Sequence, residues 1–134
     1  MLSVHQIQLP RHIIIGRDVL DSTGTTFKEL GLNGTALIIG DETTMKVAGT
    51  KVKDSLEDEK YEVALLTIEA ADIKTVNEAQ MKTRGTGASF VLGVGGGRSI
   101  DVAKLCSFNE HVPFVSIPTA ASHDGIASPQ ASVK

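Results

Sequence analysis

The chain has 134 residues, of which 41% are hydrophobic and 22% are charged, as in a single globular domain with its own core. Its net charge is −3, and its lysines and arginines form no run, which argues against a nucleic-acid-binding or polybasic membrane-binding surface. No apolar stretch approaches the ~20 residues that span a bilayer, and the N-terminal residues lack a secretory signal pattern. We therefore expect neither a nucleic-acid partner nor membrane insertion.

The only cysteine is Cys106, so an intrachain disulfide is excluded. A lone thiol fits a reducing compartment and predicts a cytoplasmic location. Because Cys106 lies in an apolar helical pattern, we expect it to pack in the core rather than to react.

The first half of the chain alternates apolar runs with helical patterns. Residues 12–16 form a short β-branched run that predicts a strand, and residues 3–9 could add an edge strand beside it. Helical spacing over residues 17–31 predicts a helix that ends at a glycine. Residues 35–40 are a continuous apolar run, typical of a strand buried on both faces. Apolar residues then recur at helical spacing over residues 45–56.

The second half repeats the alternation. Residues 62–68 predict a strand, and Asp72 is a good N-cap for the helix that follows. Residues 89–95 predict a strand, residues 98–106 a helix, and residues 114–118 a last strand that ends at a proline. Strands alternating with helices predict an α/β fold in which helices cover a parallel sheet.

The segment "GVGGGRSIDVAKL", residues 93–105, brings three consecutive glycines to the end of a predicted strand. Ligands of an open parallel sheet bind at this edge, and glycine lets another group approach the backbone. The helix that follows offers free N–H groups and the positive end of its dipole, so the run suits an anion such as a phosphate. The hydroxyl of Ser99 could add a donor. The alternative interpretation is a tight turn without a ligand.

Charged residues near the glycines have two interpretations each. Arg98 could face a phosphate or point to solvent. Asp101 is expected in the first turn of the helix, where an acid either stabilises the helix dipole or contacts the cofactor. Lys104 is expected to be a solvated helix charge.

Asp41 follows the predicted strand 35–40. An acid at this position can accept hydrogen bonds from the ribose hydroxyls of an adenosine, and it would repel a 2′-phosphate, which favours NAD over NADP. The simpler alternative is that Asp41 or a following threonine caps the next helix.

A second polar stretch, "SIPTAASHDGIASP", follows the last predicted strand. Its hydroxyls at Thr119, Ser122 and Ser128 could contact a ring or a phosphate. His123 and Asp124 are the only adjacent histidine–acid pair in the chain, but neighbouring side chains rarely chelate one metal. No convincing metal site and no hydrolase motif is present.

The pairing of "GVGGGRSIDVAK" with "SIPTAASHDGIASPQAS" about twenty residues later resembles the archaeal glycerol-1-phosphate dehydrogenases. That family belongs to a superfamily with the iron-containing alcohol dehydrogenases, glycerol dehydrogenase and dehydroquinate synthase. The resemblance implies a Rossmann-like N-terminal domain that binds NAD or NADP. It covers the whole chain in layout, and its specific residues lie between about 93 and 132.

The resemblance also implies the site residues. Its matched cofactor-binding residues are Gly97, Arg98, Ser99, Ile100, Asp101, Thr119, Ala120, Ala121, Ser122 and Ser128. The positions at the strand ends add Asp41, Gly95 and Gly96 to the expected cofactor-binding residues. Asp124 matches a substrate-site residue. No catalytic and no metal-binding residue is expected in this chain.

In the family, a zinc ion polarises dihydroxyacetone phosphate, and the nicotinamide reduces it to sn-glycerol 1-phosphate, the backbone of archaeal ether lipids. The family's zinc ligands lie in a C-terminal helical domain, which we expect beyond Lys134. Residues 1–134 would then be the first domain of a two-domain enzyme, inactive alone and prone to form homo-oligomers. Other alcohol or polyol dehydrogenases, a non-catalytic nucleotide-binding module and an unliganded structural domain remain alternatives.

Overall fold

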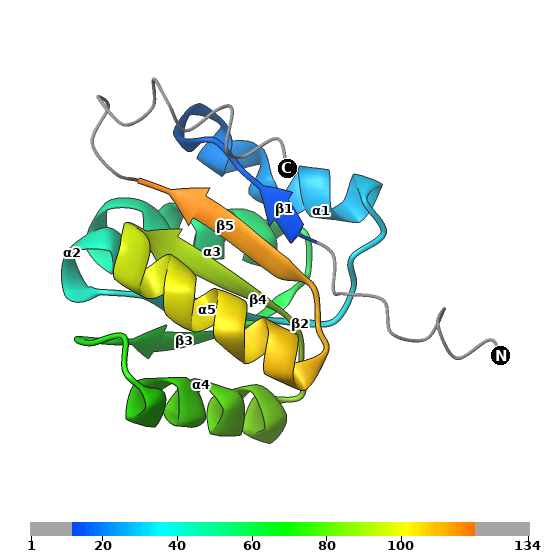
Figure 1. Cartoon of the computed structure of the whole chain (residues 1–134). Helices are drawn as coiled ribbons and strands as arrows, with labels where there is room; N and C mark the ends of the chain where they lie inside the picture. Colours follow the sequence, from blue (N-terminus) through cyan, green and yellow to red (C-terminus); the bar gives the residue numbers. More distant parts are fainter. Residues whose placement is uncertain (1–11, 120–134) are drawn as a thin grey trace, which may run out of the picture.

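A parallel β-sheet forms the centre of the computed structural model, which describes residues 12–119 (Figure 1). Five strands pair side by side in the order β1-β5-β4-β2-β3, and every pairing is parallel. The strands are β1 (His12–Ile14), β2 (Thr35–Gly40), β3 (Glu62–Thr67), β4 (Ala88–Gly95) and β5 (Phe114–Pro118). The α/β fold expected from the alternating pattern is therefore confirmed. The edge strand predicted at residues 3–9 lies outside the described residues.

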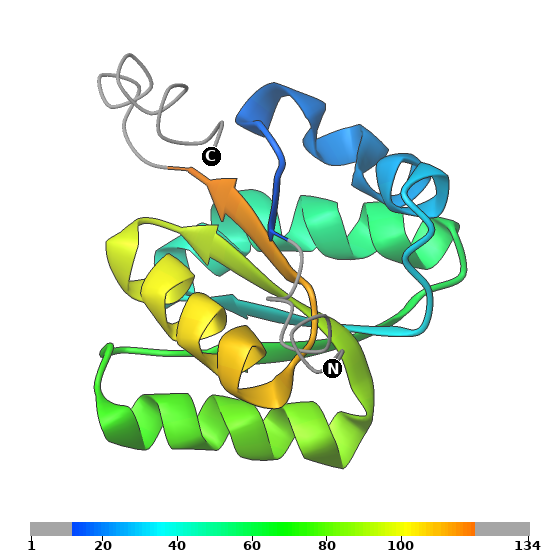
Figure 2. The same cartoon turned by 45° about the vertical axis from the view of Figure 1, so that its right-hand side comes forward.

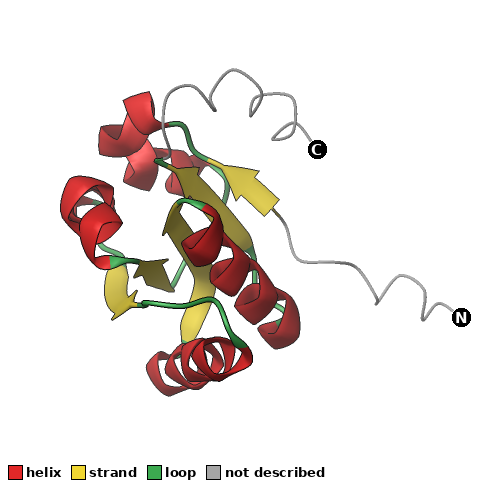
Figure 3. Cartoon of the chain, turned by 60° about the vertical axis from the view of Figure 1, so that its left-hand side comes forward, coloured by secondary structure: helices red, strands yellow, loops and turns green. Residues whose placement is uncertain are grey.

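Helices cover both faces of the sheet (Figures 2 and 3). One face carries the 3-10 helix η2 (Arg17–Ser22), α1 (Thr23–Glu29) and α3 (Thr50–Asp58), and the other carries α4 (Ile73–Thr86) and α5 (Gly97–Glu110). Consecutive residues of β2 and β4 alternate between the two cores, so both strands are buried on both faces. This two-sided burial explains their continuous apolar runs.

The first face is organised by three aromatic rings. Phe27 of α1 lies edge-to-face against Phe90 of β4, with ring centroids 5.2 Å apart, and against Tyr61 at 6.3 Å. Tyr61 and Phe90 meet at 5.7 Å. Edge-to-face packing of this kind adds about 0.5–1.5 kcal/mol per pair beyond the area that is buried. The cluster anchors α1 to the sheet.

The single helix predicted over residues 17–31 is wrong in detail, because the structure has η2 followed by α1. The break coincides with a hydrogen bond to another helix. The N–H of Gly24 donates to the Ser55 hydroxyl of α3 at 2.8 Å instead of continuing a helical ladder, and the Thr23 hydroxyl donates to the Leu20 carbonyl at 2.8 Å. A contact with a distant helix therefore decides the local geometry.

The helix predicted over residues 45–56 is longer than expected and not uniform. It begins as α2 (Glu42–Thr44), passes through the π-helical turn η3 (Met45–Gly49), and continues as α3. A Cβ atom at Gly49 would lie 2.7 Å from the Met45 sulfur, so the absent side chain makes room for Met45 in the wide turn.

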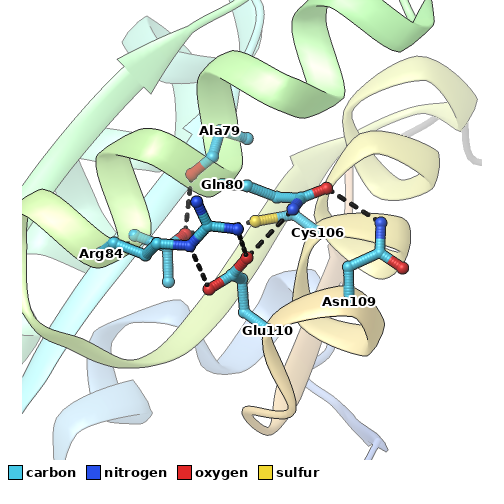
Figure 4. Close-up of polar contacts among 7 residues, drawn as sticks. Ala79, Gln80, Arg84, Cys106, Asn109 and Glu110 are labelled. Carbon is cyan, nitrogen blue, oxygen red and sulfur yellow. Dashed lines mark hydrogen bonds and ion pairs between the residues drawn. The ribbon is translucent and has the colours of Figure 1, made fainter.

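A polar network ties α4 to α5 on the second face (Figure 4). Arg84 donates to both carboxylate oxygens of Glu110, at 3.0 and 2.7 Å, and Gln80 donates to Glu110 at 3.0 Å. Beneath them the Thr83 hydroxyl lies 3.2 Å from the Cys106 sulfur. Cys106 is fully buried, as predicted, and burial raises the pKa of its thiol, which keeps it protonated and unreactive. None of the helices in residues 12–119 is long and apolar enough to cross a membrane.

His12 adds side-chain contacts to the parallel pairing of the edge strand β1 with β5. The imidazole of His12 stacks on Phe114 with ring centroids 4.6 Å apart, and its Nε2 lies 3.2 Å from the Ser116 hydroxyl. Partial burial, with a smaller contribution from the charge of Lys104, lowers the pKa of His12 below 6.5.

A lowered histidine pKa means that the folded chain binds fewer protons than the unfolded chain, so stability should fall as the pH drops below about 6.5. We expect the free energy of unfolding in urea to decrease from pH 7.5 to pH 5.5 by more in the wild type than in His12→Gln. An equal decrease in both proteins would show that His12 does not contribute to the acid sensitivity.

Candidate functional site

The carboxyl ends of the three central strands meet at one edge of the sheet (Figure 1). Gly40 of β2 pairs with Val94 of β4, and Gly95 of β4 pairs with Pro118 of β5. Helices α2 and α5 both begin at this edge, directly after β2 and β4. The structure therefore brings together the predicted positions at Asp41 and at the glycine run, which are more than fifty residues apart in the sequence.

The last residue of β4, Gly95, has no room for a side chain. Gly95 has φ +131°, a conformation that residues with a side chain rarely adopt, and a Cβ there would lie 2.8 Å from Thr44 Cγ2. At Gly96 and Gly97, by contrast, no atom of the described residues lies within 4 Å of such a Cβ. The last two glycines therefore have open space in front of them.

Among residues 12–119, no side chain caps the start of α5. Gly96 is the N-cap residue and offers no side chain, and the first helical hydrogen bond runs from Ile100 N–H to the Gly96 carbonyl at 3.2 Å. The N–H groups of Gly97, Arg98 and Ser99 precede that bond and receive no side-chain cap. Together with the helix dipole they form a surface that favours an anion.

Ser99 adds an unsatisfied hydroxyl. Its side chain is 1% exposed, and its Oγ is a buried polar atom without a hydrogen-bond partner in the described part of the chain. A buried hydroxyl that lacks a partner costs free energy, so a ligand oxygen that bonds to it would recover that cost.

The position of α5 depends on a second glycine of β4. A Cβ at Gly93 would lie 2.8 Å from the Ala103 Cβ and 3.0 Å from both the Ile100 Cα and the Ser99 carbonyl. The bare backbone at Gly93 thus lets α5 pack closely on β4. This close packing brings the N-terminus of α5 to the sheet edge.

Asp41 is the N-cap of α2. Its Oδ1 accepts from the Thr44 N–H at 2.8 Å, and the Thr44 hydroxyl accepts from the Asp41 N–H at 3.0 Å, a reciprocal capping box. The capping interpretation of Asp41 is therefore confirmed. The cap uses one carboxylate oxygen, and within residues 12–119 the other, Oδ2, has no hydrogen-bond partner. Capping and ribose binding are thus compatible roles for Asp41.

A polar cleft of about 720 Å³ opens beside this cap. Its lining residues are Asp41, Glu42, Thr43, Thr67, Ile68, Glu69 and Arg98. Arg98 reaches across from α5, and its Nη1 donates to the Glu69 carbonyl at 2.9 Å. The guanidinium thus does not point freely into solvent, because its hydrogen bond links α5 to the segment after β3. The cleft has the size of a small-molecule site.

The prediction that Asp101 lies in the first turn of its helix is wrong. Helix α5 begins at Gly97, earlier than expected, so Asp101 is its fifth residue, with no acid in the first turn. Asp101 is exposed and lies with Lys104 and Leu105 along a 340 Å³ groove against α4. Its assignment to cofactor binding stays a prediction, as does that of Ile100, which packs against the core beneath α5.

Beyond β5, the second predicted segment is described only at Thr119, whose N–H donates to the Gly95 carbonyl at 3.3 Å. The other predicted residues of this segment lie outside the described residues: Ala120, Ala121, Ser122, Asp124 and Ser128.

Sequence reasoning missed Thr44, although its side chain contacts Gly95. The spacing of Asp41 and Thr44 is that of a capping box, so the cap itself was detectable. The contact with Gly95 arises from the pairing of β2 with β4, which no local pattern indicates.

Metal binding has no support among residues 12–119, where no group of three histidine, cysteine, aspartate or glutamate residues could hold an ion. The described part of the chain therefore does not fit a metal centre.

A family model described as iron-containing alcohol dehydrogenase matches residues 14–134. A glycerol-1-phosphate dehydrogenase [NAD(P)+] of Methanosarcina acetivorans is 44% identical over 98% of this chain, and one of Methanosarcina mazei is 46% identical over 98%. The chain spans about 37% of the length of these curated relatives.

Solved structures show the same fold. A glycerol dehydrogenase of Schizosaccharomyces pombe superposes with a TM-score of 0.73 at 21% identity, covering 84% of this chain and 28% of that one. An NADH-dependent butanol dehydrogenase of Thermotoga maritima gives a TM-score of 0.61 at 24% identity, covering 73% of this chain and 25% of that one.

The glycines at the end of β4 should tolerate alanine very differently. Gly95→Ala forces an unfavourable φ and a contact with Thr44, so the free energy of unfolding should fall by at least about 1–2 kcal/mol. Gly96→Ala has φ −92° and open space, so it should cost less than Gly95→Ala, within about 1 kcal/mol, because alanine is only a poorer N-cap residue than glycine. Urea unfolding of both variants checks this, and equal destabilisation would contradict the loop geometry.

Proposed function

This chain belongs to the iron-containing alcohol dehydrogenase family, and we propose that it forms the domain that binds NAD or NADP in a glycerol-1-phosphate dehydrogenase. The observation that carries the proposal is the bare start of α5, where three uncapped N–H groups and the orphan hydroxyl of Ser99 lie after open glycines. The names and high identity of the curated relatives support the enzyme class.

The residues present fit a dinucleotide. Its diphosphate would be held by the backbone N–H groups at Gly96 and Gly97 and by the donors of the first turn of α5, where the helix dipole favours negative charge. The free Oδ2 of Asp41 would accept from a ribose hydroxyl in the neighbouring cleft. When bound, the nicotinamide supplies a hydride to the carbonyl carbon of dihydroxyacetone phosphate.

The cleft is acidic on balance. Asp41, Glu42 and Glu69 line it, and Arg98 is the one basic residue among its described lining residues. The guanidinium is bonded to the backbone after β3 and so holds one wall of the cleft in place. Hydroxyl groups of a ribose suit these carboxylates as donors, which is why we assign the adenosine half of the coenzyme to this cleft.

We further propose that the metal site, and the substrate site apart from Asp124, correspond to the part of the relatives that this chain does not match. The described residues offer no metal centre, and the chain covers 37% of the relatives' length. In this proposal the intact enzyme makes sn-glycerol 1-phosphate for archaeal ether lipids in the cytoplasm. A homo-oligomer is supported by apolar side chains on the surface of α5, where Leu105 and Phe108 are about half exposed.

A related dehydrogenase of another alcohol or polyol is the nearest alternative. The full-length enzyme should reduce dihydroxyacetone phosphate with NADH or NADPH far faster than it reduces dihydroxyacetone or simple aldehydes. Residues 1–134 alone should bind nucleotide without turnover, because we assign the metal ligands of the intact enzyme to the part of the relatives that this chain does not match. Turnover by this segment, or preference for an unphosphorylated substrate, would contradict the proposal.

Calorimetric titration of the chain with ADP and with NADH tests the nucleotide site. Both should bind the wild type, and Ser99→Ala should weaken both about tenfold through loss of one hydrogen bond to a charged group. The same substitution should stabilise the ligand-free chain by about 1 kcal/mol, because it removes a buried hydroxyl that lacks a partner.

Ser107→Ala is the matched control. Ser107 is a buried serine of the same helix, but its hydroxyl already donates to the Lys104 carbonyl at 2.9 Å. This variant should lose stability and keep its nucleotide affinity. A folded wild type that binds neither ADP nor NADH would overturn the proposed function.

A further inference from the structure

We propose that Thr44 is a positioning residue, which holds the glycine loop, residues Gly95–Gly97, in the shape that receives the coenzyme diphosphate. The inference rests on the nucleotide-binding function proposed above. In this role Thr44, a residue of the short helix α2, would connect the cap at Asp41 with the glycine loop.

The side chain of Thr44 lies against the glycine loop. A Cβ placed at Gly95 would lie 2.8 Å from Thr44 Cγ2, 3.0 Å from its Oγ1 and 3.2 Å from its Cβ. The side chain of Thr44 therefore fills the space that a side chain at Gly95 would need. On its other side, the Gly95 carbonyl accepts from the Thr119 N–H at 3.3 Å. Gly95 is thus held from two neighbouring strand ends.

Thr44 is itself held in place by hydrogen bonds. Its hydroxyl accepts from the Asp41 N–H at 3.0 Å and lies 3.3 Å from the Asp41 carbonyl, to which it donates. The same hydroxyl lies 3.0 Å from the position of a Cβ at Gly40, the last residue of β2. These contacts select one side-chain rotamer and direct the methyl group at Gly95.

In this proposal the two groups on the Thr44 Cβ have separate tasks. The hydroxyl caps α2 through Asp41, and the methyl is the group nearest to the Cβ position of Gly95, at 2.8 Å against 3.0 Å for the hydroxyl. Because Gly96 and Gly97 have no described neighbour within 4 Å of a Cβ, Gly95 is where the loop is restrained before α5 begins. Loss of the methyl should reduce the fraction of chains in the binding-competent loop shape, and apparent affinity falls with that fraction.

Two substitutions separate these tasks. Thr44→Ser keeps the capping hydroxyl and removes the methyl. Its melting temperature should stay near that of the wild type, while ADP binds several-fold more weakly, about fourfold if the whole contact of one methyl is lost. Adenosine, which lacks the diphosphate, should bind both proteins equally.

Thr44→Val makes the reverse change. It keeps the bulk against Gly95 and removes the hydroxyl that accepts from Asp41 N–H, so it should melt a few degrees lower. The folded fraction should retain wild-type affinity for ADP. Opposite effects of serine and valine on stability and on binding would not arise if Thr44 only supported the fold.

Thr75→Ser is the matched control. Thr75 occupies the same position in the cap of α4, where its N–H donates to Asp72 Oδ1 at 2.8 Å, and its helix does not begin at the glycine loop. This variant should bind ADP like the wild type.

A measurement without ligand keeps the two proposals distinct. In nuclear magnetic resonance relaxation, the backbone order parameters of Gly95 and Gly96 should fall in Thr44→Ser from about 0.85 towards 0.6. Unchanged order parameters, or an equal loss of adenosine and ADP binding, would overturn the role of Thr44. A wild type that binds no ADP, with a loop that still loosens in Thr44→Ser, would instead overturn the nucleotide site.

Discussion

The bare backbone at the end of β4 is the constraint on which the site depends. At Gly93 it admits the close approach of α5, and at Gly95 it adopts a positive φ in contact with Thr44. A side chain at either position would displace a neighbouring helix. The result is a helix whose N-terminus lies, uncapped, at the carboxyl edge of a sheet that is buried on both faces. The anion-binding character of this edge follows from that geometry.

Stability and binding compete at this helix start. Uncapped N–H groups and the orphan hydroxyl of Ser99 are unfavourable in the ligand-free chain. At the opposite end of α5, the Glu110 carboxylate accepts hydrogen bonds from Arg84 and Gln80. These bonds fix the helix to α4 (Figure 4). The C-terminal end of α5 is thus fixed by hydrogen bonds, while its N-terminal end is left accessible to a ligand, as in a preorganised site.

The sequence predicted the strands well because two-sided burial leaves continuous apolar runs, as in β2 and β4. It predicted less well what long-range contacts decide. The break before α1 depends on the long-range hydrogen bond to Ser55. The early start of α5, which moves Asp101 out of the first turn, is a local difference, because Gly96 acts as the N-cap. The capping role of Asp41 was readable from local spacing. The contact of Thr44 with Gly95 was not, because it exists only once β2 pairs with β4.

The central claim is that the open start of α5 is the diphosphate site of a dinucleotide. The most direct measurement is a titration of the ¹⁵N-labelled chain with ADP, followed by amide chemical shifts. The account predicts the largest shifts at Gly95 to Ser99, with smaller ones at Asp41 across the cleft. Shifts centred on the groove between α4 and α5, around Ala71 and Lys104, or no shifts at saturating ADP, would contradict it.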